Sequence, residues 1–182
     1  RPNAPLPVRV LAREAFATLY EALSACAKDE KDVEARQRAF AGASMSLWSD
    51  DQIGSLGLSH ALGYLLGSPY SMPHGYCSCI TLGPTISALA KSLKGDNLAS
   101  LASLYPLIDP SALSKSDEEK VDLLGQAIDD LVKKTGVDVR LGDYSVPESD
   151  LPGIIKKACT SQGRQEDQRL QDDLLQRLKA KL

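Results

Sequence analysis

Apolar residues along this chain recur with the period of an amphipathic helix rather than with the two-residue period of a strand. A first helix is predicted over residues 8–28. A second is predicted over 33–48, with Asp32 as its N-cap. Within the second helix, Gly42 and its small neighbours would let another helix approach closely, either in tight packing or as a wall of a pocket.

The helical pattern continues through the rest of the sequence. A third helix is predicted over 53–66, after a polar junction at 49–52, and a fourth helix opens at His74 and resumes after Pro84. Ser116 with Glu119 is the residue pair of a capping box and predicts a long helix that ends at Gly136.

Strand signals are nearly missing, since only residues 137–141 alternate and they are too few to build a sheet. We therefore predict an all-α helical bundle of about seven or eight helices. It comprises a linker at 1–7, a helical domain at 8–160 and an amphipathic helix at 164–182. We expect the last helix to dock on its own core in preference to forming an oligomer contact.

Composition narrows the possible partners. The chain has 182 residues and a formal net charge of −3, with no cluster of Lys and Arg, so no nucleic-acid partner is predicted. No apolar run is long enough to cross a bilayer, which predicts a soluble, cytoplasmic protein without a membrane partner. The four cysteines have neither zinc-site nor disulfide-framework spacing and are expected to be free thiols.

The chemistry concentrates in residues 57–84, which hold both histidines of the chain. His60 lies in an apolar helical run, and Tyr64 follows four residues later on the same helix face. His74 comes after a proline-containing loop that allows the chain to return. We therefore predict that His60, Tyr64 and His74 share one cavity, as groups that bind a metal or move protons on a small-molecule substrate.

Other residues are candidates for the walls of this cavity. Three glycines of the predicted third helix, at 54, 57 and 63, suggest close approach by backbone or ligand, because each costs stability within a helix. The residues predicted to bind substrate are Trp48, Gly57, Tyr70 and Tyr76. No carboxylate has ligand spacing to the histidines, and no Gly-x-Gly-x-x-Gly loop is present, so NAD binding by this chain is not predicted.

Three short motifs match a known family in register. Gly57-Leu58-Ser59-His60, Leu66-Gly67 and Pro73-His74-Gly75 keep the fourteen-residue offset between the histidines. This stretch resembles the metal-binding signature of the iron-dependent alcohol dehydrogenase and maleylacetate reductase family, which is dehydroquinate synthase-like. The resemblance extends from residue 8 to about 158, and segments 11–23, 34–48 and 143–151 look most like the maleylacetate reductase branch.

The resemblance implies a truncated oxidoreductase. In the family, Fe²⁺ or Zn²⁺ is held by an upstream Asp and His together with the histidines matched here by His60 and His74, and NAD sits in an N-terminal domain. This chain would hold only the helical C-terminal half, so the missing ligands would have to be supplied from elsewhere. Tyr64 occupies the position of a family histidine that lies near the substrate and the nicotinamide, so this sequence departs from the family's redox site at that position.

Three functions stay open at this point. The first is the helical substrate and metal half of such a reductase, paired with a separate nucleotide-binding half or acting as a homo-oligomer. The second is a free-standing, repurposed enzyme that uses His60, Tyr64 and His74 as acid–base groups in a lyase, isomerase or cyclase reaction on a small apolar substrate. The third is a non-catalytic binding protein.

Overall fold

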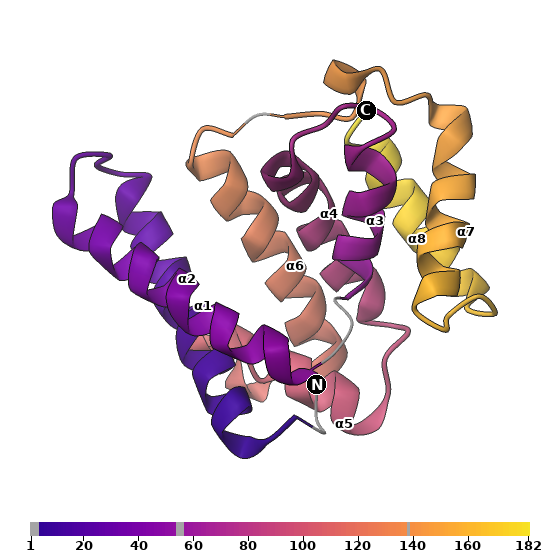
Figure 1. The fold of residues 1–182 in the computed structure, drawn as a ribbon. Helices are drawn as coiled ribbons and strands as arrows, with labels where there is room; N and C mark the ends of the chain where they lie inside the picture. The colour runs from indigo at the N-terminus through magenta and orange to yellow at the C-terminus, as the bar shows by residue number, and fades with distance from the viewer. Residues whose placement is uncertain (1–3, 54–56, 138) are drawn as a thin grey trace.

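The computed structural model describes residues 4–53, 57–137 and 139–182, with the backbone alone for 48–53 (Figure 1). Every regular element in these ranges is helical, so the all-α prediction is confirmed. The α-helices are α1 (Leu6–Cys26), α2 (Val33–Ile53), α3 (Leu58–Gly67), α4 (His74–Leu89), α5 (Gly95–Ala102), α6 (Asp117–Lys134), α7 (Leu151–Ser161) and α8 (Gln168–Lys179). Short 3-10 turns lie at η1 (Tyr105–Leu107), η2 (Pro110–Ser114), η3 (Gly142–Tyr144) and η4 (Glu148–Asp150). None of the described helices is both long and apolar enough to span a bilayer.

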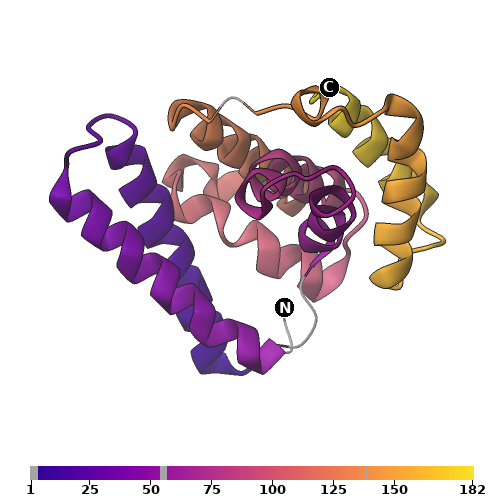
Figure 2. The same cartoon turned by 45° about the horizontal axis from the view of Figure 1, so that its top comes forward.

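The helices form three groups (Figures 1 and 2). The α1–α2 hairpin lies along one side, α3, α4 and α6 occupy the middle with α5 packed on α6, and α7 with α8 covers the far side. The hairpin is close-packed where predicted, because a Cβ added to Gly42 would lie 2.9 Å from Leu19 Cγ of α1. It is tied to the rest of the chain by Arg13, whose guanidinium donates to Ser103 Oγ at 2.5 Å.

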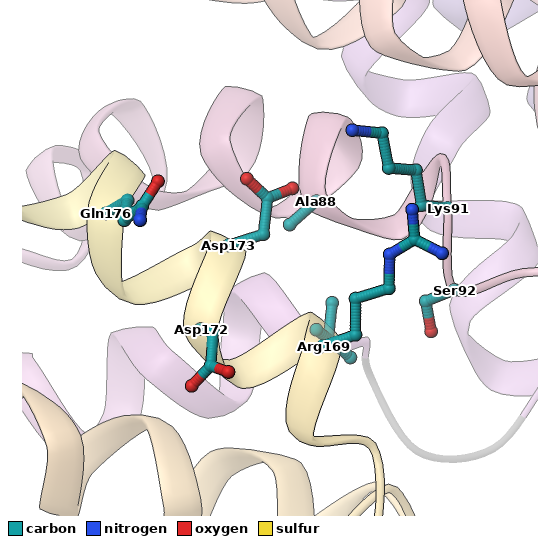
Figure 3. Close-up of a pocket in the computed structure, with 8 residues that line it drawn as sticks. Ala88, Lys91, Ser92, Arg169, Asp172, Asp173 and Gln176 are labelled. Atoms are coloured by element: carbon teal, nitrogen blue, oxygen red, sulfur yellow. The ribbon is translucent and has the colours of Figure 1, made fainter.

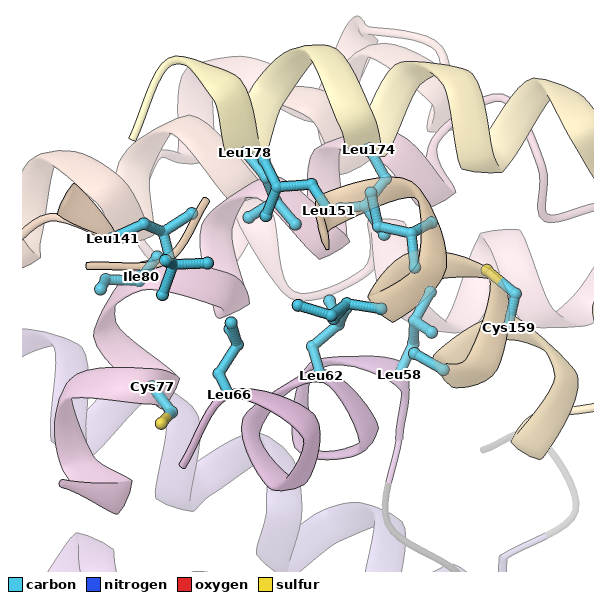
Figure 4. Packing of buried hydrophobic residues seen from close by; sticks show 14 of the residues in the cluster. Leu58, Leu62, Leu66, Cys77, Ile80, Leu141, Leu151, Cys159, Leu174 and Leu178 are labelled. Carbon is cyan, nitrogen blue, oxygen red and sulfur yellow. The ribbon is translucent and has the colours of Figure 1, made fainter. Parts of the chain in front are cut away.

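The main core lies between the middle group and the far pair. Figure 4 shows leucines of α3 meeting side chains of α4, α7 and α8. From α8, Leu170, Leu174 and Leu178 are at most 1% exposed, so the C-terminal helix is docked on this core. Burial of this leucine face provides most of the driving force that holds a helix with an otherwise polar surface in place.

Local capping signals behave as the sequence indicates. Asp32 caps α2, because its Oδ1 accepts from Ala35 N at 2.9 Å. Ser116 and Glu119 form the predicted capping box at the start of α6. The Asp32 cap and this capping box satisfy backbone N–H groups that a helix start otherwise leaves without a partner.

Three predicted boundaries were wrong. Helix α1 begins at Leu6, within the predicted linker, because a proline at position 7 is tolerated in the first turn of a helix. Helix α2 continues through the polar residues 49–52, since no Gly or Pro interrupts 43–53, and the next helix starts only at Leu58. Helix α4 is continuous through Pro84, which removes one backbone hydrogen bond without ending the helix.

Helices α4 and α6 approach each other more closely than any spacing in the sequence indicated. A Cβ added to Gly125 would lie 2.6 Å from the carbonyl oxygen of Gly83, and one added to Gly83 would lie 2.8 Å from the carbonyl oxygen of Gly125. We call this contact the glycine seam. It brings α4, whose first residue is His74, directly onto α6.

Candidate functional site

Helix α3 divides its two faces between packing and chemistry. Leu58, Leu62 and Leu66 recur every four residues and are at most 6% exposed. His60 and Tyr64 lie two residues from these leucines, which is about 200° around the helix. Because the leucine face fixes the rotation of α3 against the core, it also directs His60 and Tyr64 to the opposite side.

The turn after α3 brings His74 back to this side. The N–H of Met72 donates to the carbonyl of Gly67 at 2.9 Å, and the buried Met72 side chain anchors the turn. Ser71 adopts the left-handed conformation, with φ 53°, that the reversal requires. Helix α4 then starts at His74, with Pro73 as its N-cap.

Helices α3 and α4, which carry the histidines, are joined by contacts that sequence reasoning missed. The hydroxyls of Ser59 and Thr81 are hydrogen-bonded at 2.8 Å. A Cβ added to Gly63 would be 3.4 Å from Cys77 Cβ, which leaves little space between the two helices. Gly63 therefore serves helix packing rather than a ligand. In the sequence, the one indication of the Ser59–Thr81 hydrogen bond is that Ser59 lies next to His60.

The three predicted catalytic side chains do lie together. The ring centres of His60 and His74 are 5.0 Å apart, with 59° between the ring planes. The ring of Tyr64 is 6.2 Å from that of His60 and 6.4 Å from that of His74. We call these three residues the ring cluster.

The ring cluster lies on an open face rather than in the enclosed cavity that we expected. His60 is half-buried, His74 is exposed, and Tyr64 is 66% exposed. The hollows of about 400, 320 and 380 Å³ described in this structure contain none of the three residues. Two faces of the cluster are built by α3 and α4, and the described residues add no wall on the solvent side.

The largest of these hollows is a charged surface groove between the end of α4 and α8 (Figure 3). Lys91 and Arg169 lie on one side of it, and Asp172 and Asp173 lie on the other. Asp173 is already paired with Arg177 at 3.2 Å. With both charge signs balanced and no histidine, this groove does not replace the predicted site.

Two of the predicted wall residues, Tyr70 and Tyr76, make their contacts with other parts of the chain. The Tyr70 hydroxyl donates to Asp150 Oδ2 at 2.7 Å, and this hydrogen bond raises the pKa of the phenol. The ring of Tyr76 lies 6.4 Å from that of Tyr144, against the turn before α7. Gly57 is the N-cap of α3, and a Cβ added there would meet nothing within 4 Å, so no close approach requires a glycine. The Trp48 side chain and Gly54 lie outside the described residues.

The donor set determines which metal chemistry fits. In the described ranges, no three side chains of His, Cys, Asp or Glu gather as a metal site, so the cluster offers two imidazoles from this group of donors. An ion about 2.1 Å from an imidazole nitrogen is about 3.2 Å from the centre of that ring. If the two rings subtend about 100° at the ion, their centres lie roughly 5 Å apart. The observed 5.0 Å matches this spacing, so the pair fits one shared ion.

Electrostatics around the cluster favour an anionic oxygen. Helices α3 and α4 contain no Asp, Glu, Lys or Arg. The strongest local field is therefore the positive N-terminal end of the 16-residue α4, at His74. The nearby Cys77 is fully buried, and this burial raises the pKa of its thiol, so it acts as a packing residue rather than a thiolate ligand.

A known sequence profile matches nearly the whole chain. The sequence profile described as "Fe-containing alcohol dehydrogenase family, C-terminal" matches residues 4–182. A search of curated proteins found no match.

Solved structures show the same fold at low identity. A 1,3-propanediol oxidoreductase is 21% identical with a TM-score of 0.73, and alcohol dehydrogenase from Oenococcus oeni is 16% identical with a TM-score of 0.75. In both cases the match covers 99% of this chain and 46% of the other. The iron-containing alcohol dehydrogenase from Corynebacterium glutamicum ATCC 13032 is 20% identical with a TM-score of 0.69, covering 100% of this chain and 47% of that one. The chain thus spans about half the length of these proteins.

Proposed function

Because this chain belongs to the Fe-containing alcohol dehydrogenase family, of which it contains the C-terminal helical region, we propose that it is the metal- and substrate-binding half of an alcohol dehydrogenase-like oxidoreductase. The observation that carries this proposal is the 5.0 Å spacing of the His60 and His74 rings on an open face. That spacing suits two ligands of one ion, and the open face leaves room for a second unit that completes the site.

His60 and His74 bind the ion through neutral imidazole nitrogens. Fe²⁺ and Zn²⁺ both accept such ligands, and a bound ion would polarise a substrate oxygen as a Lewis acid. The positive end of α4 at His74 stabilises negative charge on that oxygen. The Ser59–Thr81 hydrogen bond joins α3, at the residue next to His60, to α4.

The remaining parts of the site come from a second unit. Two imidazoles are fewer than the three protein ligands of a typical catalytic site, so at least one more ligand, from this chain or from the second unit, is required. The resemblance assigns the other ligands and the NAD-binding domain to residues upstream of the region matched here. We propose that this nucleotide-binding unit, in the same or another chain, covers the exposed side of the ring cluster.

The open face argues against a free-standing enzyme. Acid–base chemistry on a small apolar substrate requires a pocket that buries most of the substrate and excludes water. Tyr64 is 66% exposed, and the described residues provide no such enclosure at the cluster. The lyase, isomerase or cyclase alternative therefore has less structural support than the two-unit oxidoreductase.

The same surroundings bear on the substrate. A dicarboxylate such as maleylacetate needs cations close to its carboxylates, and neither α3 nor α4 supplies one. A small neutral alcohol or aldehyde needs only a ligand for its oxygen. We therefore propose a neutral alcohol or aldehyde as the substrate. Maleylacetate reductase activity, which the sequence likeness favours, would require basic residues from the second unit.

Metal binding by the two histidines tests the proposal. The chain has two histidines in all, so its imidazole proton resonances report on these two residues alone. We expect Co²⁺ to broaden both imidazole signals at the same concentration. His60→Ala and His74→Ala should each weaken binding about ten-fold or more, because one ligand of a chelating pair is lost.

A matched control is Tyr76→Phe, which changes another α4 side chain that faces Tyr144 instead of the histidines. It should leave Co²⁺ binding unchanged. Broadening of one imidazole signal without the other, or unchanged affinity in either alanine variant, would refute the shared ion.

A further inference from the structure

We propose that Tyr64 is a third ligand of the same ion, so that this chain by itself presents a triad of two histidines and one tyrosine. The inference rests on the proposed function, because it requires His60 and His74 to bind a metal. In the described ranges no Cys, Asp or Glu joins the two imidazoles as a third donor, and the phenol oxygen of Tyr64 fills that role.

The placement of Tyr64 on α3 suits a ligand. His60 and Tyr64 are four residues apart on one helix, and this spacing puts two side chains over the same point, as in zinc sites with two histidines one turn apart. The leucine face holds α3 from the opposite side, so the rotation that aims His60 also aims Tyr64. The turn at residues 68–73 then adds His74 from α4.

The distances from Tyr64 to the two histidine rings support a common ion. A phenol oxygen lies about 2.8 Å from its ring centre, so an ion bound about 2 Å from that oxygen is roughly 4.3 Å from the tyrosine ring centre. With ligand angles of about 100–115°, the tyrosine ring centre would then lie roughly 5.8–6.4 Å from each imidazole centre. The observed separations are 6.2 and 6.4 Å. One ion position thus accounts for all three ring separations.

The Tyr64 hydroxyl has no competing partner in the described part of the chain. The hydroxyls of Tyr70 and Tyr105, by contrast, donate to Asp150 and Asp109. Nor does the Tyr64 ring fill space in the core, since it is 66% exposed. A large aromatic side chain held beside two imidazoles, with its oxygen unused, is well placed to bind a metal ion.

The chemistry of the three ligands indicates which ions the triad can bind. A phenolate oxygen is a hard, anionic ligand, and together with two imidazoles it resembles the two-histidine, one-carboxylate set that binds iron with open positions. On binding an ion, Tyr64 would release its phenol proton to solvent and would donate an oxygen lone pair to the metal. The same triad should also hold Fe³⁺, which serves as a probe because its bond to tyrosinate gives a visible charge-transfer band.

The test adds Fe³⁺, kept soluble as its nitrilotriacetate complex, to the purified chain. We expect a visible absorption band with tyrosinate vibrations in resonance Raman spectra. Tyr64→Phe should abolish the band, and His60→Ala should weaken it, while the control variants Tyr70→Phe and Tyr76→Phe should keep it. Tyr64→Phe should also weaken Zn²⁺ binding, measured by calorimetry, about ten-fold or more.

The outcomes separate this inference from the proposed function. If Co²⁺ broadens both imidazole signals but Fe³⁺ gives no band, the two-histidine site stands and the tyrosine ligand is refuted. A band that persists in Tyr64→Phe refutes it as well. If neither metal binds at the ring cluster, both proposals fail. Circular dichroism of Tyr64→Phe should match the unmodified chain, because the side chain is exposed.

Discussion

The glycine seam makes a sharp prediction about the helix that carries His74. Gly125→Ala should destabilise the protein, although alanine is the better helix former. The added Cβ would lie 2.6 Å from the carbonyl oxygen of Gly83 and 2.7 Å from the N of Ser87. Both neighbours are backbone atoms of α4, so no rotation of a side chain can relieve the overlap.

The size of the effect follows from the separation that α4 and α6 must undergo. An ordinary contact of this kind is about 3.4 Å, so the helices must move apart by roughly 0.7 Å, which forfeits a quarter to a half of each contact energy across the seam. Val121 and Leu124, both fully buried and close to Gly125 in α6, contribute roughly forty such contacts at about 0.15 kcal/mol each. The loss is then about 2–3 kcal/mol.

Two smaller contributions to the change in the free energy of unfolding nearly cancel. Separation weakens the hydrogen bond from Ser87 Oγ to the carbonyl of Asp122, which contributes about 1 kcal/mol. The change from glycine to alanine within a helix returns about 1 kcal/mol. The net expectation is a loss of about 2–3 kcal/mol, in the range seen when cores are overpacked.

Urea unfolding followed by far-ultraviolet circular dichroism measures this loss. With a slope of about 2 kcal/mol per molar urea, the midpoint should fall by roughly 1 M or more. Gly153→Ala is the matched control, because that glycine lies in α7 and an added Cβ meets nothing within 4 Å. It should raise the midpoint slightly. A Gly125→Ala variant as stable as the original chain would refute the close approach of α4 and α6.

Four further measurements test other parts of the structure. Ser71→Gly should raise the free energy of unfolding by up to about 1 kcal/mol, because Ser71 has φ 53°, whereas Ser68→Gly in the same turn should give no gain in urea unfolding. Leu174→Ala should lower stability by about 2–5 kcal/mol and the exposed Leu113→Ala hardly at all; equal losses would contradict the docking of α8. Hydrogen bonds from Ser116 lower the pKa of Glu119. The contribution of Glu119 to stability is therefore complete above the unfolded pKa of about 4.3 and is lost as the pH falls through the lower folded pKa. Glu119→Gln should remove this acid dependence of the urea midpoint. Calorimetry should detect no NADH binding to the chain alone, since no phosphate-binding loop is present in the sequence, and saturable binding would contradict this.

Features that depend on local spacing could be predicted from the sequence. The period of the leucines gave the helices, and Ser116 with Glu119 gave the start of α6. The turn between α3 and α4 is short, so the return of His74 toward His60 also followed from nearby residues. Gly42 was recognised because small neighbours surround it in sequence, and its partner helix is the adjacent one.

Features that depend on distant partners could not be predicted. Gly83 and Gly125 meet although forty-two residues separate them, and Gly83-Pro84 suggested a break rather than a contact. The prediction that the three side chains lie in an enclosed cavity was wrong for the same reason. The sequence shows that His60 and Tyr64 share a face of α3, but whether anything covers that face depends on which elements pack there. The pairing of Tyr70 with Asp150 likewise joins residues far apart in the chain.

The histidine spacing and the enclosure of the site therefore have different origins. This chain sets the spacing, because the leucine face fixes α3, the glycine seam fixes α4, and the Gly63–Cys77 contact sets the gap between them. The same packing leaves the ring cluster open, since each of these contacts lies behind or beside the histidines. A second unit that covers the cluster has only to bring its own ligands and wall to an imidazole pair already at the distance one ion needs. The conformational entropy of the two imidazoles is lost when the helices fold, so completing the site does not require a further loss.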